Sequence, residues 1–543
     1  MRVAEVRGLA SSTDTERPER KKKTYNKITS KRVKRSIFQF LEFLVCHEGM
    51  LELAAEIDAE IGPPPGQVRG GRRRDYVVMD IVVFDVARWF FRTYVAVEEN
   101  LADPLEWARL RLANRRAHPN RPDLRLSETP PTRGQHWRFR KDHLTEEMKE
   151  RVRDGLRTLA VQAGIEVGIL PAIAHDSWTN PEHFLVGDGL YLPALFKTPA
   201  WKATDPATGT TKRTDPEARP YQGYDSNKVG SVGYTAINIS GRADDRRKRI
   251  VFDCDLKPGG TEPDLSTSPK SEADIATDLY LGLVADYKEE METNRGLGYD
   301  MAMRSVNIDR IQDAGKMAPT KIPYNHKGAP TEITVGEQNF KTVTGRKEEH
   351  VVYGVNGTPC IIMPDGTGEL WFVPLRRVQT KRTKRESGKF VFHGIWEIRK
   401  SKTSLQTQIV PKRLEKATTI IRHNSKEKER DPGPGKRHSR RTIGLSIIPE
   451  SDPAFEIPNG KRQDSESHNS DIKARLRYER CPTTTRKNVH FTLLTNQLRT
   501  IITALIAHSQ NNHATLTRFY GNHKPQSRGS PIDLDKLDEA LAA

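Results

Sequence analysis

The sequence NGKRQDSESHNSDIKARL, residues 459–476, carries the pattern on which the interpretation of the chain depends. Arg462, Glu466 and Lys473 stand four and seven positions apart. At roughly 100° per helical residue, the three side chains fall within about 40° of one another, while Ile472 and Leu476 point elsewhere. The spacing therefore predicts a helix with one face that carries a carboxylate between two cations.

A surface ion-pair ladder gives the same spacing, so the pattern needs support from other segments. A metal site for phosphate chemistry requires further carboxylates that converge from different elements. Asp188 lies inside the apolar run FLVGDGLYL, residues 184–192, where an uncompensated charge is costly. Asp300 ends the short segment GYD. Asp188 is a candidate metal ligand at the end of a central strand, or alternatively a turn residue that caps Gly189.

Length and charge limit the classes of protein to which the chain can belong. With 543 residues, it is long enough for about two to four domains. The 89 Lys and Arg exceed the 71 Asp and Glu, and the net charge of +18 favours a polyanionic partner, with nucleic acid as the first candidate. An anionic membrane surface is disfavoured, because the most apolar segment, 76–97, is interrupted by four charged residues. Four scattered cysteines without a CxxC pair exclude a zinc ribbon and indicate a reducing compartment. The polar, basic N-terminus lacks a signal peptide, so we expect a cytoplasmic protein.

The N-terminal part is predicted to be helical and basic. Residues 1–36 form a basic disordered arm, which is either a solvated tail or a DNA-phosphate contact. Residues 37–116 form a helical DNA-binding module, with helices over 37–61, 76–97 and 104–116. Residues 117–143, rich in Pro, Arg and His, are interpreted as a linker.

The fold class predicted for the remainder is α/β, a mixed sheet of ribonuclease H type with flanking helices. A first core segment, 144–323, contains a helix over 144–163, paired strands over 234–240 and 249–256, helices over 272–290 and 306–314, and a strand over 317–322. A second core segment, 450–508, contains the glutamate helix and a last helix, 488–508, that should lie on the sheet. A polar tail, 509–543, follows.

Between the two core segments, residues 324–449 are predicted to be a β-rich insertion. Its predicted strands are 351–355, 359–363, 369–374 and 389–398, and its basic loops are 376–385 and 422–441. Trp371 and Trp396 are predicted core residues, with stacking on an extruded base as the alternative.

The chain resembles bacterial insertion-sequence transposases of the DDE, ribonuclease H-like superfamily, in the group with a Tyr-Arg-Glu-Lys signature. The resemblance rests on VGDGLY around Asp188, GYDMAMRSVNIDRIQDAG around Asp300 and KRQDSESHNSDIKARL around Glu466. It covers about residues 184–508, including the β-rich insertion. Arg462, Glu466 and Lys473 match the signature spacing, whereas Asn459 stands where the signature has tyrosine.

The resemblance implies an enzyme that cleaves DNA at the ends of an insertion sequence and transfers the freed strands to target DNA. Asp188, Asp300 and Glu466 would be catalytic and would hold two Mg²⁺ ions, for which Mn²⁺ substitutes. Arg462 and Lys473 would bind DNA phosphates. The partners would be double-stranded terminal inverted repeats and target DNA, bound by a homodimer. The protein would be a bacterial, nucleoid-associated one.

Other acids and other functions stay open on the sequence alone. Asp253 or Asp255, both on the predicted strand 249–256, can replace Asp300, whereas Asp225 and Asp309 are interpreted as turn and helix-surface residues. No His cluster and no Gly-rich phosphate loop occurs, which disfavours a zinc hydrolase or an NTPase. The alternative functions are a non-catalytic or decayed DNA-binding protein and a nuclease of the same fold without strand transfer.

Overall fold

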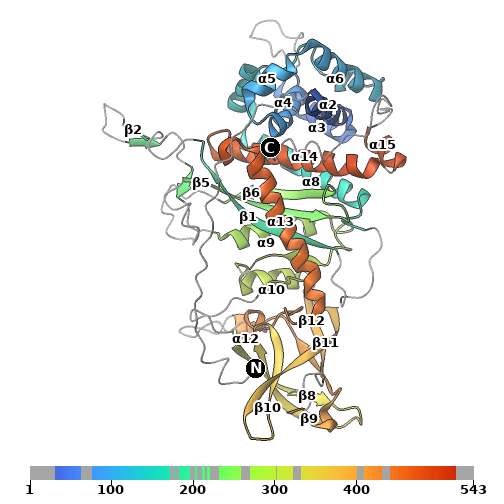
Figure 1. Cartoon of the computed structure of the whole chain (residues 1–543), viewed down its shortest axis with the longest axis vertical. Coiled ribbons are helices and arrows are strands. Elements are labelled where there is room, and N and C mark those ends of the chain that lie inside the picture. Colours follow the sequence, from blue (N-terminus) through green and yellow to red (C-terminus); the bar gives the residue numbers. More distant parts are fainter. Residues whose placement is uncertain are drawn as a thin grey trace. The chain divides into compact units, whose positions relative to one another are not determined.

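The structure is a computed structural model that forms two compact units (Figure 1). It describes residues 31–62, 76–171, 178, 183–195, 202–204, 211–213, 217–220, 232–257, 270–300, 302–321, 332–399, 409–430, 441–510 and 512–520. The first unit contains the described residues of 171–188 and 271–465, and the second contains those of 31–170, 189–270 and 466–520. Strand β1 (Phe184–Pro193) and helix α13 (Glu456–Arg475) each contribute residues to both units.

The helical N-terminal region predicted from the sequence is confirmed, with two changes of boundary. Its helices are α2 (Lys31–Cys46), α3 (Glu48–Ile61), α4 (Val78–Phe91), α5 (Tyr94–Leu101) and α6 (Pro104–Ala117). Helix α2 begins inside the segment predicted to be a disordered arm, the rest of which, 1–30, lies outside the described residues. The single helix predicted over 76–97 is two helices, because Arg92 adopts a left-handed conformation with φ of 66° and ends α4.

The segment 117–143, predicted to be a linker, is instead folded against the helices. It contains a short 3-10 turn η1 (Pro122–Leu124), helix α7 (Arg133–Arg138) and a π-helical turn η2 (Phe139–His143), which leads to α8 (Glu146–Glu166). Arg140 is only 4% exposed, and its guanidinium donates to Oδ1 of Asp85 on α4 at 2.7 Å. The linker prediction failed because the sequence alone does not distinguish a charged residue that pairs with a distant partner from one in contact with solvent.

The sheet of the second unit is covered by a long buried helix. Strand β5 (Val232–Arg242) pairs antiparallel with β6 (Arg249–Leu256), as predicted, and with the two-residue strand β4 (Arg219–Pro220). Helix α14 (Arg486–Ser509) lies on β6, where the side chain of Gln497 donates to the carbonyl of Phe252 at 2.9 Å. A separate hairpin consists of β2 (Lys202–Thr204) and β3 (Thr211–Arg213).

The predicted polar tail is partly helical. Helix α15 (His513–Tyr520) follows α14, and it buries Phe519 and Tyr520, which the polar composition around them did not indicate. Tyr520 packs edge-on against Phe43 of α2, with ring centroids 4.9 Å apart. Residues 521–543 of the predicted tail lie outside the described part.

In the first unit, β1 pairs in parallel with the short strand β7 (Gly296–Gly298). Helices α9 (Glu272–Asp286) and α10 (Ser305–Asp313) precede and follow β7 along the chain, close to the predicted bounds. The strand predicted over 317–322 is reduced to one bridge between Met317 and Gly296. A Cβ at Gly296 would lie 1.9 Å from the carbonyl oxygen of Met317, so this close approach of two backbones requires glycine.

The predicted β-rich region is a closed six-stranded barrel, drawn mainly in yellow in Figure 1. Its strands are β8 (Glu332–Lys341), β9 (Lys347–Val355), β10 (Thr358–Pro364), β11 (Leu370–Lys384), β12 (Phe390–Ile398) and β13 (Thr418–Arg422). The prediction of a basic loop over 376–385 is wrong, because almost all of this segment belongs to β11. Strands β8 and β13 were not predicted. Helix α12 (Glu427–Arg430) lies in the second predicted basic loop, of which 431–440 fall outside the described residues.

Two observations concern the cysteines and the apolar segments from which the cellular compartment was predicted. Cys46, Cys254, Cys360 and Cys481 are buried free thiols. Among the described helices, none combines the length and the apolar character needed to cross a bilayer.

Candidate functional site

The parallel pairing of β1 with β7 ends two residues before two of the predicted catalytic acids. Val186 lies opposite Gly298 in the ladder, and Asp188 and Asp300 each follow their member of this pair by two residues. Side chains two positions apart along an extended chain point to the same face, and neighbouring strands lie about 4.8 Å apart. The ladder thus places Asp188 within β1, two residues after the last residue that pairs with β7, and Asp300 two residues beyond the end of β7.

The backbone around Asp300 is held by hydrogen bonds within the first unit. Oδ1 of Asp300 accepts from the amide of Ala302 at 2.8 Å, and the carbonyl of Asp300 accepts from Oγ1 of Thr320 at 2.6 Å. The preceding residue, Tyr299, is 3% exposed. Burial raises the pKa of Tyr299 well above its ordinary value, and the charges of Asp300, Glu272 and Asp188 act in the same direction. Tyr299 therefore lies within the electrostatic field of both predicted ligands.

Helix α13 runs past the same strand. Within the first unit, Oγ of Ser465 donates to the carbonyl of Arg462 at 2.6 Å and lies 3.4 Å from Oδ2 of Asp188. Within the second unit, the side-chain amide of Asn469 lies 3.4 Å from the carbonyl oxygen of Gly189. Residues 465 and 469 are one helical turn apart, so one face of α13 follows β1.

The charged face predicted on α13 is present. Glu466 is exposed and Arg462 and Lys473 are partly exposed, whereas Ile472 and Leu476 are 0% and 1% exposed. The predicted orientation of the apolar residues is therefore confirmed. Glu466 itself follows Ser465 directly along the helix, next to the residue that approaches Asp188.

The three acids fit magnesium in type, because Mg²⁺ prefers carboxylate oxygens. Among the described residues, no group of three or more His, Cys, Asp or Glu side chains is arranged to hold a metal ion. Asp188 and Asp300 belong to the first unit, whereas Glu466 is the first residue of α13 in the second unit.

The alternative acids are engaged elsewhere. Asp253 is 1% exposed and accepts from Nε and NH2 of Arg153 at 2.7 and 2.9 Å. Asp255 accepts from Arg486 at 3.1 Å. Asp309, predicted to be on a helix surface, is buried instead and accepts from the amide of Ser425 at 3.0 Å. Asp225 lies outside the described residues.

The two tryptophans of the barrel differ in accessibility. Trp396 is 0% exposed in the barrel core, which agrees with its predicted core role and leaves no face for a nucleobase. Trp371 is partly buried, and its Nε1 donates to Oδ2 of Asp365 at 3.0 Å. Of the two tryptophans, base stacking stays a prediction for Trp371 only.

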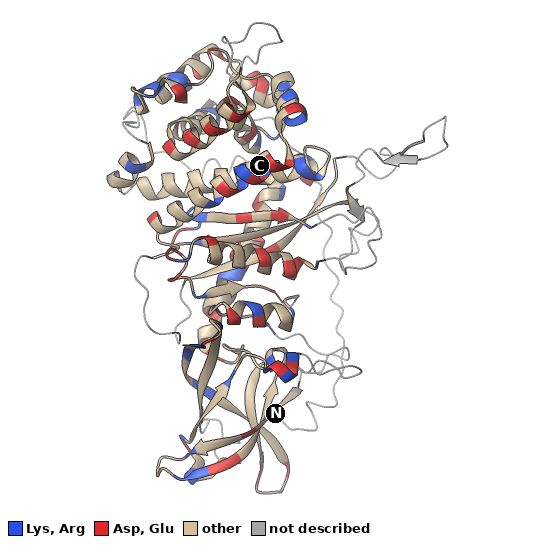
Figure 2. Ribbon diagram, turned by 180° about the vertical axis from the view of Figure 1, so that it is seen from behind, with Lys and Arg blue, Asp and Glu red and all other residues tan. Residues whose placement is uncertain are grey.

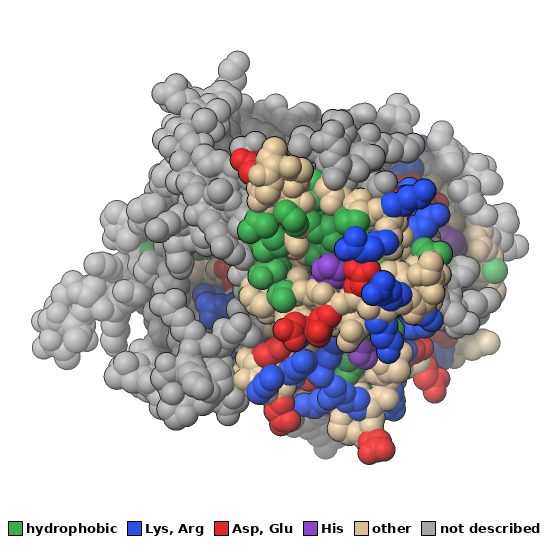
Figure 3. All heavy atoms as spheres, turned by 90° about the horizontal axis from the view of Figure 1, so that it is seen from below, with side chains coloured by type: hydrophobic (Ala, Val, Ile, Leu, Met, Phe, Trp, Pro, Cys, Tyr) green, Lys and Arg blue, Asp and Glu red, His purple; other side chains and the backbone are tan. Residues whose placement is uncertain are grey.

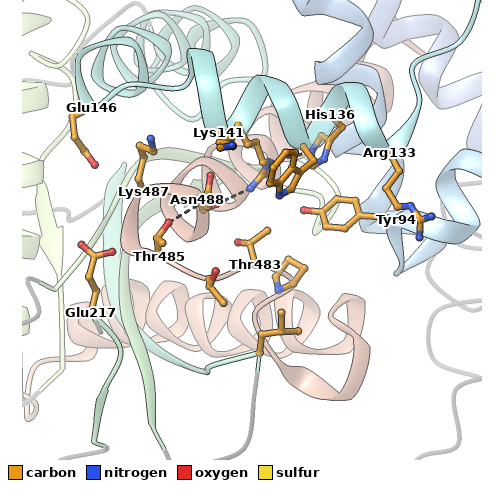
Figure 4. Close-up of a pocket in the computed structure, with 15 residues that line it drawn as sticks. Tyr94, Arg133, His136, Lys141, Glu146, Glu217, Thr483, Thr485, Lys487 and Asn488 are labelled. Carbon is orange, nitrogen blue, oxygen red and sulfur yellow. Dashed lines mark hydrogen bonds between the residues drawn. The ribbon is translucent and has the colours of Figure 1, made fainter. Parts of the chain in front are cut away.

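A cavity of about 780 Å³ in the second unit was not predicted from the sequence (Figure 4). Its walls include Arg133, Trp137 and Lys141 from the segment predicted to be a linker, and Lys487 from α14. Trp137 is 59% exposed, and Nζ of Lys141 lies 4.9 Å from the centre of its ring. An exposed aromatic ring among cations suits a nucleic-acid base and its phosphate. The aromatic and basic residues of 133–141 were a signal that could have found this site.

Basic residues are distributed over many elements. Lysines and arginines alternate with acids along the helices in Figure 2. The face in Figure 3 likewise shows both signs of charge beside a group of hydrophobic side chains.

No protein-family model and no curated protein matches this chain. The arrangement defines a mixed α/β protein with an N-terminal helical region and a closed six-stranded barrel.

Proposed function

We propose that this protein is a DNA transposase of an insertion sequence, with a ribonuclease H-like core interrupted by the barrel. The parallel pairing of β1 with β7 carries the proposal, because each acid follows the last pair of this ladder by two residues and a shared metal site requires acids from adjacent segments. The approach of Ser465 to Asp188 adds support, since it brings the neighbour of Glu466 to the same strand.

In this proposal, Asp188, Asp300 and Glu466 are the catalytic acids and the ligands of two Mg²⁺ or Mn²⁺ ions. The bound metal would act as a Lewis acid toward the scissile phosphate. Arg462 and Lys473 would bind the neighbouring phosphates, Arg with two parallel hydrogen bonds and Lys as a point charge. The substrates are the terminal inverted repeats and target DNA, held by a homodimer in the bacterial cytoplasm.

A second candidate is a DNA-binding protein without catalytic turnover. One observation favours it: the described residues contain no assembled group of three metal-binding side chains. In that case, the basic residues of α13 would bind DNA while the acids contribute only to local structure.

The test uses the purified full chain, Mg²⁺ or Mn²⁺, and DNA that carries the terminal repeats flanking the coding region. Cleaved and joined products support transposition, cleaved products alone support a nuclease, and bound but intact DNA supports the second candidate. Glu466→Ala should abolish cleavage and leave DNA binding intact. Glu456→Ala, an exposed acid at the start of the same helix, is the matched control.

A further inference from the structure

A small basic cavity lies in the second unit, where the β5–β6 hairpin, the C-terminal half of α13 and α14 meet. Its volume is about 220 Å³, several times the roughly 30 Å³ that one water occupies. The lining includes the arginines 246, 247, 249, 475 and 499 and a single carboxylate, Asp471. Among the lining residues the arginines exceed the carboxylates by four, and one of these arginines, Arg247, pairs with Asp245 at 3.1 Å outside the lining.

Both oxygens of this carboxylate are already engaged. Oδ1 of Asp471 accepts from Nε of Arg475 and Oδ2 accepts from NH2 of Arg499, each at 2.7 Å. The two arginines are 2% and 5% exposed. Burial alone would raise the pKa of Asp471, but the two guanidinium groups hold it well below its usual range. One carboxylate thus serves two buried cations, which leaves the cavity positive.

A buried histidine provides a second observation. His468 lines the cavity and is 2% exposed, and its Nε2 is buried with no hydrogen-bond partner among the described residues. Leaving such a group unsatisfied costs about 1–3 kcal/mol. An acceptor atom inside the cavity would remove this cost.

We propose that this cavity binds a phosphate group of the DNA backbone. Phosphate oxygens match the planar donor fork of arginine, accept from an imidazole N–H, and supply the missing negative charge. This inference rests on the proposed function for its choice of DNA over free phosphate. His468 lies two residues after Glu466 on α13, so a backbone phosphate held here would fix the DNA along the helix that carries the proposed third acid.

The first experiment measures binding of inorganic phosphate by its effect on the melting temperature, against chloride at equal ionic strength. Phosphate at low millimolar concentration should raise the melting temperature of the wild type and not that of Arg249→Gln. Arg242→Gln is the matched control, because Arg242 lies opposite Arg249 in the same hairpin and does not line the cavity. Equal shifts in all three proteins, or no shift in the wild type, would overturn the site.

The second experiment measures DNA affinity at several salt concentrations. Each lost phosphate contact lowers the slope of log K against log[salt] by about one. We expect the slope to decrease by about one in Arg249→Gln and to stay unchanged in Arg242→Gln. A phosphate shift without a change of slope would reject DNA as the occupant and leave a site for free phosphate. If the wild type does not bind DNA at all, the proposed function fails, while the melting experiment still judges the cavity.

Discussion

Val186 of β1 lies opposite Gly298 of β7 as the last pair of a parallel ladder, and Asp188 and Asp300 each follow this pair by two residues. Gly296, two residues before Gly298, is the point at which the carbonyl of Met317 approaches most closely. The short strand that precedes Asp300 is thus held between two backbone segments.

Gly296→Ala should therefore destabilise the protein. The added Cβ would meet the backbone of Met317 at 1.9 Å, and overpacking of this kind costs about 1–3 kcal/mol. Gly298→Ala is the control, because its Cβ would lie 3.4 Å from a side-chain methyl of Val186, an ordinary contact. A melting curve should show a clear decrease for the first variant and little change for the second. Equal melting temperatures would contradict the observed packing.

Asp85→Asn should be more damaging, because Asp85 is 0% exposed and neutralises buried Arg140. Burial raises the pKa of Asp85, but Arg140 and His136 outweigh it and hold the pKa below its usual value. Removing one partner of a buried ion pair costs about 3–5 kcal/mol. Asp123→Asn, in an exposed pair with Arg121, should have little effect on the melting temperature. Similar melting temperatures for both variants would show that the buried pair is unimportant.

Asp80 lies on the same helix as Asp85, but its pKa is raised whereas that of Asp85 is lowered. The two carboxyl groups therefore give pH dependences of stability with opposite signs. Burial raises its pKa to about 7, although the amides of Ser127 and Val77 donate to it. In the unfolded chain the pKa is about 3.9. Between about pH 4 and 7, the folded state retains a proton that the unfolded state has lost, so this contribution to stability decreases as pH rises. Melting curves over this range should show a weaker decrease for Asp80→Asn. An unchanged pH dependence would argue against a protonated Asp80.

Trp371→Ala tests the remaining base-stacking prediction. If a base stacks on Trp371, truncation should weaken binding of single-stranded DNA by about 1–3 kcal/mol. Trp396→Ala should instead lower stability by about 3–5 kcal/mol, because its side chain is fully buried. Fluorescence-based binding and melting curves separate the two effects. Unchanged affinity of Trp371→Ala would exclude stacking at this residue.

Much of the local structure followed from periodicity in the sequence. The amphipathic patterns that predicted α8 and α9 and the alternation that predicted β5 and β6 depend on short-range order, which the sequence displays directly. Predictions failed where the burial of a residue depends on partners that are distant in the sequence. Arg140 is buried because Asp85 neutralises it, and most of the basic residues of β11 sit on the outward face of a barrel that only closure with β10 and β12 creates.

In the candidate site too, features that depend on short-range patterns were predicted, and features that depend on distant segments were not. Asp188 and Asp300 were predicted because an acid in or beside an apolar run is conspicuous, and both follow the last pair of the parallel ladder by two residues. The charged face of α13 was predictable from helical spacing. The basic cavity at His468 was not, because its arginines come from three elements that are adjacent only in the folded chain.

We expect Asp188 and Asp300 to act together on DNA. The most direct measurement is metal-dependent cleavage of DNA that carries the terminal repeats, by the wild type, Asp188→Asn, Asp300→Asn and the control Glu456→Gln. We predict that the wild type and the control cleave, and that each aspartate variant binds DNA with wild-type affinity but gives no product. Cleavage by either aspartate variant at the wild-type rate would contradict the account.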